Sequence, residues 1–168
     1  MTQKIVTEPS VGSQLDPRRW IALAVIVAAQ FMVVLDVAIV NVALPSIRSS
    51  LHFSTIGLQW VVNAYTIGFA GFLLLGGRLA DLLGRRRVFI VGTALFALSS
   101  LACALADSRG LMIGARSLQG FAGAVVSPAT LSIITSAFEE GPARNRALGM
   151  WGAVGALGRR RVRCSAEC

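Results

Sequence analysis

The stretch that decides the fold runs from Trp20 to Leu44 and reads WIALAVIVAAQFMVVLDVAIVNVAL. Its only charged residue is Asp36. Its apolar residues are continuous rather than alternating, which excludes a membrane-spanning β-strand. A helix of about 20 such residues crosses the roughly 30 Å hydrocarbon core of a bilayer. The run is too long for the apolar part of a signal peptide, so it predicts an uncleaved first membrane span.

Three further apolar runs follow, and the sequence therefore predicts an all-α membrane protein. The predicted spans are residues 20–44, 56–77, 88–106 and 111–138, followed by an incomplete fifth at 147–158. Residues 1–19 are polar and irregular in composition and form a predicted N-terminal tail. Because the connections are short, we expect consecutive helices to be antiparallel neighbours in one bundle that covers residues 20–158.

The overall composition indicates that the solvent is lipid. Hydrophobic residues make up 55% of the 168 residues and charged residues only 14%, with a mean hydropathy of +0.69. A soluble domain has roughly 25% charged residues. The predicted partner is therefore the lipid bilayer. With three cysteines and one histidine, the chain offers too few ligands for a disulfide framework or a metal site, and we expect no cofactor.

The basic residues predict how the chain is oriented. Lysine and arginine concentrate in the N-terminal tail and in the connections after the second and fourth predicted spans, whereas the other two connections hold one arginine each. Cytoplasmic connections are enriched in these residues, so the N-terminus is predicted to be cytoplasmic, in a multi-pass protein of the cell membrane. The same distribution explains the net charge of +8 without a nucleic-acid partner.

Two ionisable residues lie inside predicted spans, Asp36 in the first and Arg116 in the fourth. An ionised side chain at the centre of a membrane helix costs about 2.5–3.5 kcal/mol, so each suggests a function. A buried carboxylate can load and release a proton as its surroundings change, which suits a proton-coupled pump. The alternative is a purely structural ion pair or hydrogen-bonding group. Asn41 lies about 140° around the helix from Asp36, so the two need not share a role.

The fourth predicted span carries a polar stripe. Arg116, Gln119, Gly120 and Gly123 fall at i, i+3, i+4 and i+7, which places them on one helix face. That face is expected to meet protein or water rather than lipid. Pro128 lies further along the span, where it removes one helical hydrogen bond and predicts a kink.

The connection after the second predicted span, which starts at Gly77, reads GRLADLLGRRR and resembles the G-x-L-A-D-x-x-G-R-[KR] motif of major facilitator transporters. Gly77 and Gly84 would allow a tight turn, and Asp81 would accept hydrogen bonds near a helix N-terminus. Arg85 and Arg86 would hold the connection in the cytoplasm. The resemblance implies that this connection acts as a conformational switch between the two halves of a transporter.

Two further motifs resemble the fourteen-helix drug/proton antiporter branch of that superfamily. Residues 35–45 read LDVAIVNVALP and residues 116–124 read RSLQGFAGA. The resemblance implies proton-coupled efflux of drugs or other amphipathic small molecules, driven by the proton gradient. It assigns proton coupling to Asp36, Arg116 and Gln119, and helix packing or kinks to Asn41, Pro45, Gly120, Gly123 and Pro128.

The C-terminal residues depart from the family pattern. After residues 147–158 the chain reads RRRVRCSAEC, where relatives continue into a Gly-Pro motif. We expect residues 159–168 to be an out-of-frame tail or a truncation artefact, and the truncated chain to be inactive alone. The alternative is a genuine short protein whose basic tail lies on the anionic inner leaflet.

The alternative to a transporter fragment is a non-transporting membrane interaction module. Such a module would pair with a transporter, or with itself, through faces of small residues such as Ala64 and Gly68. An enzyme is not expected, because no nucleophile–base pair or metal cluster lies at membrane depth.

Overall fold

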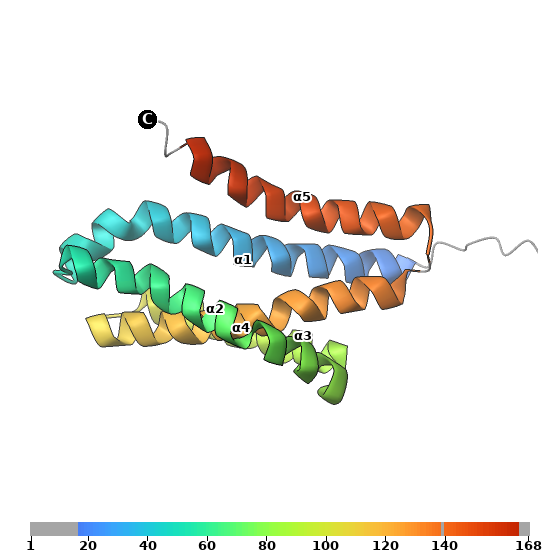
Figure 1. Ribbon diagram of the computed structural model, residues 1–168, viewed down its shortest axis with the longest axis horizontal. Helices are drawn as coiled ribbons and strands as arrows, with labels where there is room; N and C mark the ends of the chain where they lie inside the picture. Colours follow the sequence, from blue (N-terminus) through green and yellow to red (C-terminus); the bar gives the residue numbers. More distant parts are fainter. Residues whose placement is uncertain (1–16, 139, 165–168) are drawn as a thin grey trace, which may run out of the picture.

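The computed structural model describes residues 17–138 and 140–164, which form five helices and, within these ranges, no strand (Figure 1). The helices are α1 (Pro17–Ser50), α2 (Thr55–Leu83), α3 (Arg85–Ala104), α4 (Arg109–Ala137) and α5 (Pro142–Cys164). The first four are long and apolar enough to cross a membrane. The predicted all-α membrane class is confirmed.

Short connections with local signals separate the helices. The hydroxyl of Ser54 accepts a hydrogen bond from the amide of Gly57 at the start of α2, and Ser108 caps α4 by accepting from Leu111. Between α2 and α3 stands Gly84 alone, with a φ of +91° that favours glycine. The connections alternate between the two ends of the bundle, as antiparallel helices require (Figure 1).

Helix α4 forms the centre of the bundle. It packs along α2 and α3, and it contains the longest series of buried residues of any described helix. Helix α1 lies between α4 and α5 (Figure 1), and its contact with α4 is narrower than its contact with α5. The indole N–H of Trp151 in α5 donates to the hydroxyl of Thr130 in α4 over 3.2 Å. Each of the other four helices therefore contacts α4.

Glycine lets α2 and α4 approach each other at backbone distance. A β-carbon at Gly68 would lie 2.6 Å from the carbonyl oxygen of Ser117. A β-carbon at Gly120 would likewise overlap the carbonyl oxygen of Tyr65. Ala64 is buried in the same interface. The predicted close packing through small residues is therefore present, and it joins α2 to α4.

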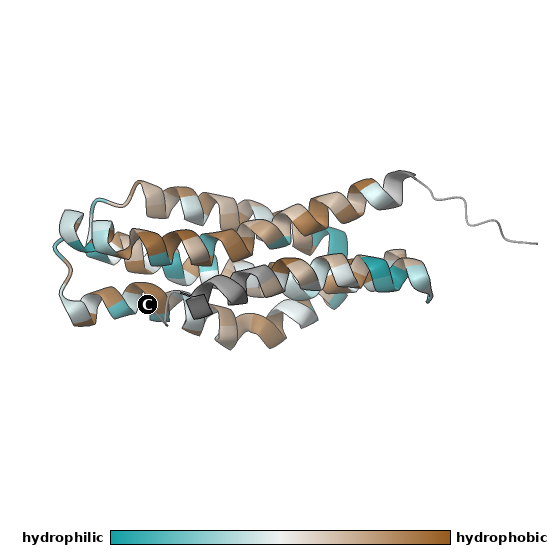
Figure 2. Ribbon diagram, turned by 90° about the horizontal axis from the view of Figure 1, so that it is seen from above, coloured by the Kyte–Doolittle hydropathy of each residue, from teal (hydrophilic) through white to brown (hydrophobic). Residues whose placement is uncertain are grey.

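The outside of the bundle is apolar. Leu74 is 87% exposed, Val42 81% and Ile56 73%, values that would be unfavourable in water but suit contact with lipid. Figure 2 shows hydrophobic residues along the middle of the helices and many of the hydrophilic ones toward the ends. The surface thus has the composition of a lipid-facing bundle.

The helices extend beyond the predicted spans. Helix α1 begins at Pro17, inside the predicted tail, and α2 continues to Leu83, so the connection that follows is one residue rather than a loop. Helix α5 continues past the predicted end at residue 158 to Cys164. Backbone hydrogen bonding does not stop where the apolar residues stop, and arginine is a good helix former. The out-of-frame origin of residues 159–168 stays a prediction, and residues 1–16 and 165–168 lie outside the described ranges.

Candidate functional site

The two ionisable residues of the predicted spans meet in one ion pair. The Nη1 of Arg116 in α4 lies 2.8 Å from Oδ2 of Asp36 in α1. Gln119, one turn further along α4, bridges both partners: its Oε1 accepts from Arg116 Nη1 at 2.7 Å, and its Nε2 donates to Asp36 Oδ1 at 2.8 Å. The side chains of Arg116 and Asp36 are 3% and 12% exposed, and Gln119 is fully buried. We call these three residues the charge cluster.

The charge cluster is a closed ring of three hydrogen bonds that fixes its own orientation. Arg116 has only donors, and an ionised Asp36 has only acceptors. Gln119 must therefore turn its carbonyl to the arginine and its amide nitrogen to the carboxylate. The opposite orientation of the amide would place donor against donor and acceptor against acceptor. Buried charges are tolerated when they are paired and hydrogen-bonded in this way.

Helices α2 and α3 complete the surroundings of the charge cluster. The guanidinium carbon of Arg116 lies 5.6 Å from the centre of the Tyr65 ring, which is a cation–π distance. The thiol of Cys103 in α3 approaches Oε1 of Gln119 at 3.7 Å. Side chains from four helices thus meet at the charge cluster.

Arg116 also lines a small cavity of about 110 Å³ between α1 and α2. Its Nε is buried and has no hydrogen-bond partner in the described part of the chain. Tyr65 and Thr66 of α2 and Asn41 of α1 line the same cavity. A cavity of this size has room for water, which needs about 10–15 Å³ per molecule, although most of its lining is apolar.

Of the residues predicted for helix packing, the glycines have an evident spatial role. At Gly123 a β-carbon would lie 3.3 Å from the hydroxyl of Tyr65 and 3.3 Å from the Phe69 ring, so the glycine makes room for the aromatic residues of α2. Asn41 is exposed and donates to the carbonyl of Val37 at 2.9 Å, apart from the charge cluster. Pro45 and Pro128 lie inside α1 and α4, and their predicted kinks stay predictions.

The residues of the predicted switch connection lie around the α2–α3 turn. Gly77 and Asp81 belong to the last two turns of α2, and the exposed Arg86 belongs to the first turn of α3. Arg85 donates to the carbonyl of Ser132 in α4 at 3.3 Å. The N-terminus of α3 has no side-chain cap, and Asp81 is exposed in α2. The switch role of these residues stays a prediction.

Sequence reasoning missed several contacts of the site. The spacing of residues along the chain does not identify Tyr65 or Cys103 as part of the site. Each lies on a different helix and meets the charge cluster only when that helix packs against α4. From the sequence, Arg109 was expected only to contribute to the orientation of the chain in the membrane. It donates to the carbonyls of Leu51 and His52 and stacks on Phe53 at 5.8 Å, and so ties together two connections at the same end of the bundle.

The fold and site together define a multi-span membrane protein with a paired charge buried at its centre, an arrangement typical of proteins that move ions or solutes. A sequence model of the Major Facilitator Superfamily matches residues 26–159. The chain belongs to this superfamily of transporters.

Relatives with drug-related names are similar to this chain. It is 50% identical to the puromycin resistance protein pur8 of Streptomyces alboniger over 139 residues, which are 83% of this chain and 28% of the relative. It is also 50% identical to the cephamycin export protein CmcT of Amycolatopsis lactamdurans over 82% of this chain and 28% of the relative. The multidrug resistance protein Stp of Mycobacterium tuberculosis is 45% identical over 76% of this chain and 24% of the relative. The chain thus matches only about a quarter of the length of these proteins.

Proposed function

We propose that this chain supplies the first helices of a proton-driven exporter of amphipathic small molecules in the cell membrane. The observation that carries the proposal is the charge cluster, in which Arg116 and Gln119 of α4 hold the carboxylate of Asp36 in α1. The printed names of the three relatives, which refer to resistance or export, support drugs as the class of substrate.

The charge cluster gives protonation of Asp36 a structural consequence. A proton that pointed into the ring from Oδ2 would face the N–H of Arg116, and one that pointed into it from Oδ1 would face the amide of Gln119. Turning the Gln119 amide would relieve one clash and create another at Arg116. Protonation also removes the negative charge of the carboxylate, so both bonds that Asp36 accepts lose their charge assistance and weaken even where the new hydrogen points out of the ring.

Weakening these two bonds would loosen α1 from α4. The two bonds that Asp36 accepts are the polar contacts between these helices in the described part of the chain, and the helix interface is narrow. A proton would therefore bias the position of α1, which is how a ligand shifts a two-state equilibrium. The Nε of Arg116, which is buried and unpaired in the described part of the chain, would become available to a water or substrate acceptor if the movement of α1 exposed it.

The proposal includes the orientation of the chain in the membrane. Arginines cluster beside the α2–α3 connection and at the start of α5, which lie at one end of the bundle, whereas the connections at the opposite end are flanked by Arg48 and Arg109 alone. The arginines of residues 159–163 lie in the last turns of α5, outside the connections between the four candidate spans. By the positive-inside rule the first of these ends is cytoplasmic, together with the N-terminus.

We expect residues 1–168 expressed alone not to transport. Transporters of this kind bind substrate near the membrane midplane between two repeats that rock against each other, and this chain supplies helices of one repeat. The alternative of a membrane interaction module finds less support. The small residues Gly68 and Gly120, which would serve such pairing, are already occupied between α2 and α4. Co-purification of a stoichiometric membrane partner from mild detergent would favour the module.

A chimera tests the proposed function. Residues 20–158 replace the matching segment of the Streptomyces alboniger relative, and puromycin accumulation is measured in an efflux-deficient host. We expect the chimera to lower accumulation and Asp36→Asn to return it to the level of the host, because asparagine must point one N–H at Arg116 or Gln119. Asp107→Asn, the same change at an exposed residue, serves as the matched control. Efflux by Asp36→Asn equal to that of the control would refute the proposal.

A further inference from the structure

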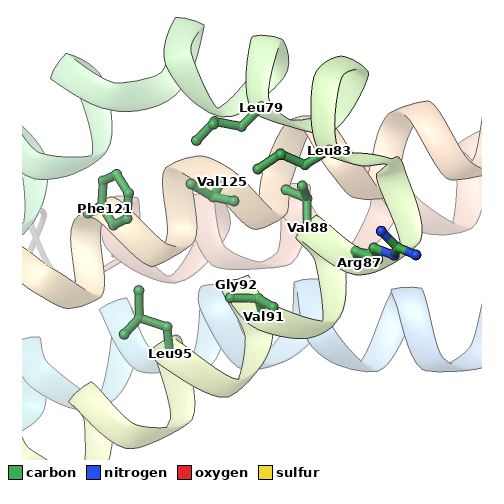
Figure 3. A pocket seen from close by; sticks show the side chains of 9 residues that line it. All are labelled: Leu79, Leu83, Arg87, Val88, Val91, Gly92, Leu95, Phe121 and Val125. Atoms are coloured by element: carbon green, nitrogen blue, oxygen red, sulfur yellow. The ribbon is translucent and has the colours of Figure 1, made fainter.

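An apolar groove lies between α2 and α3, away from the charge cluster. The two helices are joined by Gly84 alone and both pack on α4, but they make little contact with each other. The groove has a volume of about 340 Å³. Leu79 and Leu83 of α2 form one wall and Val91 and Leu95 of α3 the other (Figure 3).

The groove is open at the surface and closed at its base. Phe121 and Val125 of α4 line the base, whereas Leu83 and Val91 are 59% and 66% exposed at the opening. Its lining offers almost nothing that could hydrogen-bond to water. In a bilayer the occupant must therefore be apolar.

One cation stands at one end of the groove. Figure 3 shows Arg87 beside the α2–α3 turn, with Leu95 and Phe121 toward the other end. Arg85, two residues earlier, already donates to α4, and the same turn carries the exposed Arg86. Arg87 has no hydrogen-bond partner in the described part of the chain. An apolar slot that ends in a free guanidinium is complementary to a molecule with a long apolar chain and an anionic head.

We propose that this groove binds an acyl chain of an anionic membrane phospholipid, whose phosphate pairs with Arg87. Basic pockets between membrane helices bind anionic lipid head groups in this manner, and arginine pairs well with phosphate. An apolar membrane helix packed across the opening would cover the groove but would bring no anionic partner for Arg87. The inference needs the membrane-inserted fold but not proton coupling.

Lipid retention on the purified 168-residue chain tests the proposal. Native mass spectrometry compares phosphatidylglycerol with phosphatidylcholine of identical acyl chains. We expect the chain to retain phosphatidylglycerol preferentially and Arg87→Gln to lower this retention about fivefold. Arg86→Gln removes the same charge one residue away, outside the groove, and should leave retention unchanged.

A second variant tests the acyl-chain part of the site. Val91→Trp fills the groove from an exposed position and should abolish retention while the far-ultraviolet circular dichroism stays that of the parent. Equal retention of the two lipids, or equal losses in Arg86→Gln and Arg87→Gln, would overturn the proposal. Displacement of the lipid by inorganic phosphate alone, or retention only in a dimer of the chain, would also overturn it.

Discussion

The carbonyl oxygen of Ala124 in α4 lies against Gly76 of α2, and it is also the carbonyl that Pro128 leaves without its usual helical donor. A β-carbon at Gly76 would overlap this oxygen. The proline therefore frees an acceptor at a point where the neighbouring backbone comes very close. Weak Cα–H···O contacts are common at such helix crossings.

This contact predicts that Gly76→Ala destabilises the bundle. The added methyl group meets backbone atoms that cannot rotate away, so we expect a loss of about 1–3 kcal/mol in the free energy of unfolding. Unfolding of the purified chain by SDS in detergent micelles, followed by circular dichroism, measures it. Gly71→Ala is the control, because no atom lies near a β-carbon there. Equal stability of the two variants would contradict the close packing.

Removing the bridge of the charge cluster should also destabilise the bundle. Gln119→Leu leaves Arg116 and Asp36 with one hydrogen bond fewer each in a buried site, and we expect a loss of about 1–3 kcal/mol. The same SDS titration measures it. Gln59→Leu, at an exposed position of α2, should stay within about 0.5 kcal/mol of the parent. A loss no larger than that of the control would show that the ring contributes little.

Tyr65 should support Arg116 through its ring rather than its hydroxyl. Tyr65→Phe keeps the face of the ring over the guanidinium, whereas Tyr65→Leu removes the cation–π contact, worth about 0.5–2 kcal/mol. We therefore expect the leucine variant alone to lose stability and, in the chimera, puromycin efflux. Parallel losses in both variants would assign the role to the hydroxyl instead.

Cysteine labelling tests the proposed orientation. Ser108→Cys and Glu140→Cys place thiols at opposite ends of the bundle, in a background whose three native cysteines are replaced by serine. A membrane-impermeant maleimide added to intact cells should label the first and not the second, because the arginine clusters keep the end near Glu140 in the cytoplasm. The reverse pattern would invert the topology.

Much of the fold could be predicted from the sequence. The four long apolar runs identify the four candidate membrane helices, because bilayer thickness fixes the length that such a run needs. The helix ends could not be read in the same way. Helix α2 runs through Arg78 and Asp81 to Leu83, since a helix continues beyond the hydrocarbon until a residue such as Gly84 ends it.

The residues of the candidate site could be predicted from the sequence, but their arrangement in space could not. The cost of charge in a membrane helix identified Asp36 and Arg116, and spacing placed Gln119 on the face of Arg116. That Asp36 meets this face depends on how α1 is rotated against α4, which only the packed bundle determines. The same holds for Tyr65, which approaches Arg116 because the glycines of α4 admit α2 so closely.

Proton movement in liposomes tests the central claim most directly. The chimera is reconstituted with a pH-sensitive dye inside, and a puromycin gradient is imposed. If the charge cluster couples protons to export, the parent and Asp107→Asn should move protons in response to puromycin, and Asp36→Asn should move none. Puromycin-driven proton movement by Asp36→Asn at the rate of the parent would contradict the account.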